Sequence, residues 1–160
     1  MFSPRLRSRE IVTTVTGGFL AFAVIFGVFL TALPNHLEAD FGLSARGRGL
    51  MLGLPAITSS IVAFNMSRIR RHVSTGGFLA VASVVWTGSF ILIGLSPTLS
   101  LVVVGSLVYG LGEGALIPSL QDAAITRAPD RHRGAVMATW TACARLGQTT
   151  GPMLAAAIMA

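Results

Sequence analysis

Hydrophobic residues are arranged in five long runs that short polar segments separate. The runs cover about Ile11 to Leu33, Gly49 to Asn65, Gly76 to Leu95, Leu99 to Ile125, and Gly134 to the end of the chain. A helix needs roughly 20 residues to cross a hydrocarbon core of about 30 Å, and each run approaches or exceeds that length. The pattern therefore predicts an all-α membrane protein with five transmembrane helices.

Composition agrees with this class of protein. Hydrophobic residues make up 52% of the chain and charged residues 11%, whereas a soluble domain carries roughly 25% charged residues. The net charge is +6 and every Lys or Arg position is an arginine. Most of these arginines lie in the short segments between runs. A nucleic-acid partner would need a soluble basic face. The predicted partner is instead the lipid bilayer, and no nucleic acid is expected.

The placement of arginine predicts the orientation of the chain. Cytoplasmic loops carry an excess of basic residues. Three segments on one side of the alternating path are rich in arginine, and the 96–98 turn on the other side has no charge; the arginines are Arg5, Arg7, Arg9, Arg68, Arg70, Arg71, Arg127, Arg131 and Arg133. We therefore expect a multi-pass protein of the cell membrane with a cytoplasmic N-terminus.

Two segments of unequal size are expected along the chain. Residues 1–10 are expected to be a cytoplasmic linker or N-terminal tail, and residues 11–160 a transmembrane helical bundle. The first apolar run is longer than the 7–15 residues of a signal-peptide core, which favours a membrane anchor. The last run has no polar flank. We therefore expect the bundle to be incomplete.

Two charged residues lie inside apolar runs. Glu113 lies sixteen residues before Pro129 and Arg145 lies sixteen residues after it, so an antiparallel hairpin would place them at similar depth. Charges in hydrocarbon are costly and usually face a bundle interior or a wet pathway. If they face each other, an ion pair lowers the cost of both. One interpretation is a proton-coupling or substrate site, and the other is a structural ion pair that fixes the hairpin.

The last two runs are also rich in glycine and proline. Small residues allow close helix packing, and a proline after glycines is a frequent cause of a kink. The candidate positions for helix packing and kinking are Gly110, Gly112, Gly114, Pro118, Gly147, Gly151 and Pro152.

Three motifs resemble those of the major facilitator superfamily. The segment 63–72 resembles the loop motif GxxxDRxGRR, although Ala63, Ser67 and Arg70 replace the first Gly, the Asp and the second Gly. The segment 129–134 resembles P-x-x-x-R-G, and 147–152 resembles GxxxGP, the motif of the fifth helix in antiporters. Their order along the chain is more specific than any one of them.

The resemblance implies two six-helix halves around a cavity that opens alternately to either side. It further implies secondary transport of a small organic solute or drug, coupled to protons, as in antiporters and efflux proteins. The 106–112 segment lacks the Arg and Gln of the RxxQGxG motif that many drug–proton antiporters carry on the fourth helix. This absence favours the C-terminal half, without its sixth helix, and implies an N-terminal half of the same transporter as partner.

The resemblance also suggests a cytoplasmic charge network. In the family, arginines of the loop motif contact neighbouring helix ends and hold one conformation. The corresponding candidates here are Arg68, Arg71, Asp122 and Arg133. The alternative is that these are solvated charges that only set the orientation.

No sequence feature indicates an enzyme. The chain shows no phosphate loop, no nucleophile with a base and no metal-ligand spacing, so no cofactor is expected, and Cys143 is expected to be an inert thiol. Two rival interpretations stay open at this stage. One is a non-transporting membrane subunit or assembly protein, and the other is half of a transporter with five-helix repeats.

Overall fold

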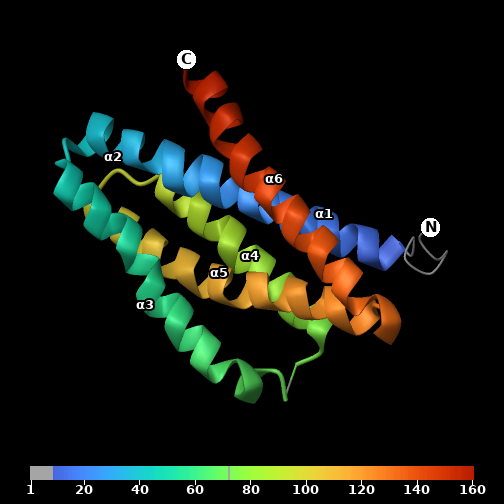
Figure 1. Cartoon of the computed structure of the whole chain (residues 1–160). Coiled ribbons are helices and arrows are strands. Elements are labelled where there is room, and N and C mark those ends of the chain that lie inside the picture. The colour runs from blue at the N-terminus through green and yellow to red at the C-terminus, as the bar shows by residue number, and fades with distance from the viewer. Residues whose placement is uncertain (1–8, 72) are drawn as a thin grey trace. The chain divides into compact units, whose positions relative to one another are not determined.

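The computed structural model describes residues 9–71 and 73–160, which are almost entirely helical and contain no strand (Figure 1). The predicted all-α fold is thereby confirmed. In chain order the elements are α1 (Arg9–Val24), the π-helix η2 (Ile25–Ala32), α2 (Leu33–Phe41), α3 (Ala45–Ile69), α4 (Thr75–Gly94), α5 (Leu99–Arg127), the short 3₁₀ helix η3 (Asp130–His132) and α6 (Arg133–Met159). Most of the predicted tail 1–10, including Arg5 and Arg7, lies outside the described residues, as does His72.

The helices form two compact units. The first consists of residues up to 35 together with 120–160, so α1 and η2 pack with α6 and with the last turns of α5. The second consists of residues 36–119 and holds α3, α4 and most of α5. The chain passes between the units inside α2 and inside α5, in each case within two residues of a proline, Pro34 or Pro118. A proline inside a helix removes one backbone hydrogen bond.

The first helical run is longer than its hydropathy predicts. The sequence places its end at Leu33, but the helix continues through Pro34 to Phe41. It ends at Gly42, whose φ of 61° is left-handed and whose N–H donates to the Glu38 carbonyl over 3.0 Å. A glycine in this conformation is a common helix terminator. The prediction was wrong because hydropathy reports the lipid boundary and not the end of the helix.

The middle of that run is a π-helix, which the sequence did not predict. In η2 the Thr31 hydroxyl donates to the Phe26 carbonyl at 2.7 Å, and the Leu33 N–H donates to the Val28 carbonyl. Both bonds reach back five residues instead of four. Such segments are rare and are frequent at functional sites.

The next two helices begin at serine caps. Ser44 accepts a hydrogen bond from the Gly47 N–H at 3.3 Å, and Ser74 accepts one from the Gly77 N–H at 3.2 Å. The first cap starts α3 at Ala45, so the predicted start at Gly49 was late. The second starts α4 within a residue of its predicted position. An N-cap side chain satisfies one of the free N–H groups of a helix start.

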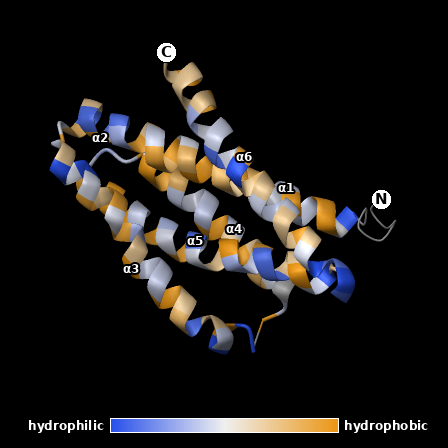
Figure 2. Cartoon of the chain, viewed as in Figure 1, coloured by the Kyte–Doolittle hydropathy of each residue, from blue (hydrophilic) through white to orange (hydrophobic). Residues whose placement is uncertain are grey.

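Four helical segments of the described residues are long and apolar enough to cross a membrane: Ile11–Phe41, Ala45–Ile69, Gly76–Gly94 and Leu99–Arg127. The fifth predicted span is present as α6 but is not among them. Its middle carries Arg145, Gln148, Thr149 and Thr150. Figure 2 shows hydrophobic colour along most helices and hydrophilic colour at the α5–α6 connection and within α6. The side of the membrane on which each loop lies remains a prediction.

Candidate functional site

Glu113 lies in the middle of α5, beside an aromatic cluster of the second unit. Its side chain is half-buried, and one turn earlier Tyr109 is only 1% exposed. Tyr109 and Glu113 are four residues apart and so are neighbours on the surface of α5. The ring of Tyr109 lies 5.9 Å from that of Trp86 and 5.3 Å from that of Phe90, both on α4. We call Trp86, Phe90, Tyr109 and Glu113 the Glu113 cluster.

Three glycines on α5 bring the neighbouring helices close to this cluster. A Cβ on Gly112 would lie 2.7 Å from the Trp86 Cβ, and a Cβ on Gly114 would lie 2.7 Å from the Ser59 Cα of α3. A Cβ on Gly110 would overlap Thr58 and the backbone of Pro55. Since real side chains do not approach so closely, glycine is required at all three positions for these contacts.

A hydrogen bond also ties α3 to α5. The Thr58 hydroxyl donates to the Leu107 carbonyl at 2.8 Å and lies 3.2 Å from the Pro55 carbonyl of its own helix. Hydroxyl groups commonly join helices in membranes in this way. The backbone around Glu113 is therefore held on two sides, by α3 and by α4.

Arg145 lies on α6 in the first unit, in a different environment. Its side chain is exposed in the described residues, and its Nη1 donates to the Gln148 Oε1 at 3.0 Å. The Thr149 hydroxyl donates to the Arg145 carbonyl at 3.1 Å. Because Glu113 belongs to the second unit, the pairing of Glu113 with Arg145 stays a prediction.

The opposite face of α6 packs against α1 and η2. A Cβ on Gly147 would overlap the Phe19 carbonyl, and one on Gly151 would overlap the Ala23 carbonyl. Conversely, a Cβ on Gly27 of η2 would lie 2.6 Å from the Gly151 carbonyl oxygen. Pro152 follows directly, inside the helix. The GxxxGP segment is therefore the closest part of this helix contact, and the π-helix lies against it.

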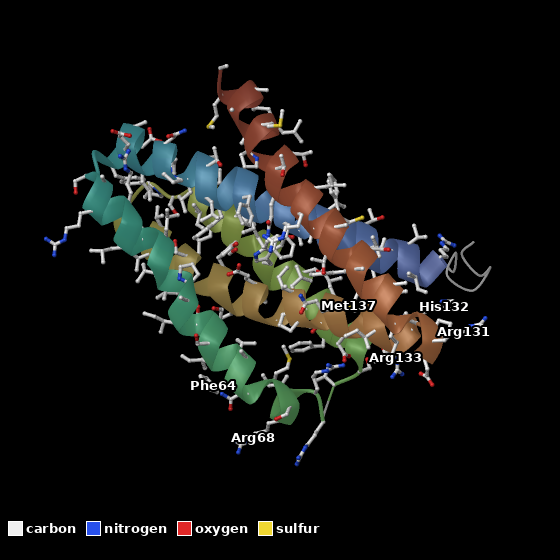
Figure 3. The ribbon with its side chains drawn as sticks, in the orientation of Figure 1. Phe64, Arg68, Arg131, His132, Arg133 and Met137 are labelled. Atoms are coloured by element: carbon white, nitrogen blue, oxygen red, sulfur yellow. The ribbon has the colours of Figure 1, made fainter. Side chains whose placement is uncertain are left out.

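The four predicted cytoplasmic charges are distributed over both units. Arg68 lies in the last turn of α3 and Arg71 just beyond it, both exposed. Figure 3 shows Arg68 and Phe64 at that end of α3, and Arg131, His132 and Arg133 at the α5–α6 connection. Arg133 pairs with Asp130 at 3.0 Å. Asp122 is half-buried on α5 in the first unit. A network that joins these residues stays a prediction.

Sequence reasoning missed three members of these sites. These are Trp86, Tyr109 and Gln148. The i, i+4 spacing of Tyr109 and Glu113 was the available signal, since such residues are neighbours on a helix surface. The i, i+3 spacing of Arg145 and Gln148 was the corresponding signal on α6. Among the residues that the structure describes, no group of His, Cys, Asp and Glu could hold a metal ion.

Four helical segments of membrane-spanning length in the described residues, one of them with Glu113 at its centre, define a multi-pass helical membrane protein. A family model described as Major Facilitator Superfamily matches residues 15–160, and the chain belongs to this superfamily. Proteins of this superfamily are transporters rather than enzymes. No curated protein and no solved structure matches the chain. The resemblance predicted from the sequence motifs is confirmed, whereas assignment to the C-terminal half remains a prediction.

Proposed function

We propose that the protein performs proton-coupled secondary transport of a small organic solute by alternating access, with Glu113 as the proton-carrying group. The observation that carries this proposal is the environment of Glu113. A half-buried carboxyl lies at the centre of a membrane-length helix, one turn after the buried Tyr109 and near three close-packed glycines of the same helix. Ionisable groups at such positions usually mark a transport pathway or a proton relay.

The chemistry of this carboxyl suits a coupling role. A charged carboxylate among apolar groups is costly, and protonation removes that charge. The energy of the helix contacts then depends on whether a proton is bound. A group that changes charge within a packed helix cluster can bias two conformations of the bundle, which is what coupling to a proton gradient requires.

Arg145 is the proposed partner of Glu113 in one state of the cycle. Both lie near the middle of their helices, sixteen residues from Pro129 in each direction. Protonation of Glu113, or a substrate that binds Arg145, would break the pair and shift the balance between inward-open and outward-open states. In this proposal the helices act together with a second half of the transporter around the cavity.

The test combines neutral substitutions with gradient-driven transport in cells that express the protein. Ethidium and fluorescein, a cationic and an anionic dye, are followed with and without a protonophore. Glu113→Gln should abolish protonophore-sensitive accumulation or expulsion but leave dye exchange intact, because no group then titrates. The matched control is Glu38→Gln, which removes an exposed carboxylate that pairs with Arg48 near the end of α2. Normal gradient-driven transport in a well-expressed Glu113→Gln variant would remove Glu113 from the mechanism.

The double variant Glu113→Gln/Arg145→Gln tests the pairing itself. Removing one partner of a buried ion pair leaves an uncompensated charge, at a cost of about 3–5 kcal/mol. If the two residues pair, the double variant should express better than either single variant, yet still lack gradient-driven transport. Full transport by the double variant would instead show a structural pair. Absence of any Glu113-dependent or protonophore-sensitive dye movement would favour a non-transporting membrane subunit.

A further inference from the structure

The exposed face of α6 carries a polar stripe near the middle of the helix. Thr141, Arg145 and Gln148 follow one another at helical spacing, and none of them belongs to the buried face of the helix. Arg145 lies twelve residues after the start of α6, or about 18 Å along it at about 1.5 Å per residue. If α6 crosses the membrane, as the sequence predicts, Arg145 lies near the middle of a hydrocarbon core of about 30 Å.

The rotation of α6 about its axis is fixed by its packing. Gly147 and Gly151 touch backbone carbonyls of α1, and the ring of Trp140 lies against Gly18, where a Cβ would be 2.7 Å from the indole Nε1. None of these contacts leaves room for a side chain. The polar stripe is therefore held away from α1 and η2 by the tightest contacts of the first unit.

The guanidinium of Arg145 is oriented by one hydrogen bond and has further N–H donors. Arginine presents five N–H donors in a planar fork, and the hydrogen bond to Gln148 uses one nitrogen, Nη1. The amide of Gln148 is neutral, so this bond orients the fork without neutralising its charge. The remaining donors match a carboxylate, which binds a guanidinium through two parallel hydrogen bonds.

We infer that Arg145 and Gln148 form a binding site for the carboxylate of an organic anion, so that the transported solute is anionic. This inference rests on the transport function proposed above and names its substrate class. A single carboxylate is favoured over phosphate because Arg145 is the one arginine between residues 134 and 160. A phosphate dianion would keep an uncompensated charge in a low-dielectric site.

The test measures binding to the detergent-solubilised full chain by thermal unfolding at constant ionic strength. The probes are benzoate, its neutral analogue benzamide, and inorganic phosphate. Benzoate should raise the Tm in a saturable manner, whereas benzamide and phosphate should not. The inference is overturned if benzamide raises the Tm as much as benzoate does. It is also overturned if phosphate raises the Tm and benzoate does not, or if benzoate has no effect.

Variants then assign the effect to the two residues. Arg145→Lys keeps a cation but loses the planar fork, so it should weaken benzoate affinity about tenfold, and Gln148→Leu should weaken it several-fold by releasing the guanidinium. Arg145→Gln should abolish benzoate binding. If that variant does not fold, the benzoate affinities of Arg145→Lys and Gln148→Leu test the inference. Arg131→Gln, which removes an exposed arginine of η3, is the control and should bind benzoate as the original protein does. Equal benzoate affinity in all variants overturns the inference.

The benzoate test and the transport test of the proposed function can fail independently. Benzoate binding that does not depend on Arg145, together with Glu113-dependent transport, would overturn the anion site and leave proton coupling intact. Arg145-dependent benzoate binding with transport that ignores the proton gradient would support the anion site and remove the coupling role of Glu113.

Discussion

Helices α5 and α6 both combine close-packed glycines with a charged residue near the middle of the helix, but they place them differently. On α6 the glycines lie on the face toward α1, and Arg145 lies on the exposed face. On α5 the glycines at 110, 112 and 114 lie on either side of Glu113 along the chain, and they bring both α3 and α4 against it. Packing and charge are therefore segregated on α6 and interleaved on α5.

This difference has a consequence for function. A change in the packing face of α6 should alter the stability of the first unit without altering the chemistry at Arg145. A change in the packing of α5 moves the groups that surround Glu113, so stability and chemistry cannot be changed independently there. Glu113 is the better placed of the two to convert a change of charge into a change of helix packing.

The largest effect is expected from a side chain placed in the α6 contact. In Gly151→Val the new Cβ would overlap the Ala23 carbonyl of α1, and a carbonyl cannot move without displacing its helix. Overpacking of this kind costs about 1–3 kcal/mol and occasionally more, and we expect about 3 kcal/mol in the free energy of unfolding. Denaturant titration in detergent measures it.

The control for that variant is Gly134→Val in the first turn of α6, where no atom lies near the added Cβ. It should change stability by less than about 0.5 kcal/mol, since valine has a slightly better helix propensity than glycine. If segregation holds, Gly151→Val that still folds should bind benzoate with unchanged affinity. A stability loss shared equally by both variants would mean that the α6 contact is not tight.

A smaller and less separable effect is expected on α5. In Gly112→Ala the methyl group would lie 2.7 Å from the Trp86 Cβ and 2.8 Å from its Cα, so the backbone of α4 must move. We expect a loss of about 2 kcal/mol, together with altered proton-coupled transport, because the ring of Trp86 packs against that of Tyr109, one turn from Glu113. Unfolding and dye transport on one preparation measure both.

Gly88→Ala on α4 is the matched substitution, with no atom near the new methyl group. There the change should stabilise the protein by up to about 1 kcal/mol, because alanine is the better helix former. The stability changes at Gly112 and Gly88 should therefore have opposite signs, which separates the effect of a close helix contact from that of helix propensity. Gly112→Ala that loses stability but keeps normal transport would contradict the interleaving of packing and charge on α5.

The sequence predicted the number and approximate positions of the helical runs because hydropathy reports membrane residence directly. α4 and the start of α5 fall within a residue of their predicted positions. The end of the first run was missed because the apolar run stops at Leu33, whereas the helix continues until Gly42. The π-helix could not be predicted because its five-residue hydrogen bonds depend on packing and not on a residue type.

The charged candidates were predicted from depth alone, and their neighbours were not. Glu113 and Arg145 are visible in a sequence because charges are rare inside apolar runs. The surroundings of Glu113, with Trp86 and Phe90, arise from contacts between α4 and α5 that no local pattern encodes. Arg145 lies on the exposed side of α6 because Gly147 and Gly151 pack against α1 on the other side. The spacing of these residues in the sequence does not show which side of α6 packs against α1.

The smallest predicted effect compares one hydroxyl in each unit. Thr58 donates to the Leu107 carbonyl across the α3–α5 contact at 2.8 Å, so Thr58→Val should cost about 0.6 kcal/mol, the average for hydrogen bonds between membrane helices. Thr149 on the exposed face of α6 donates within its own helix, to Arg145 at 3.1 Å, so Thr149→Val should change the free energy of unfolding by almost nothing. Both substitutions replace a hydroxyl by a methyl group of similar volume, so their difference isolates the bond between helices. Equal losses in the two variants would show that the hydroxyl of Thr58 adds nothing to the contact and that glycine packing alone holds α3 against α5 beside Glu113.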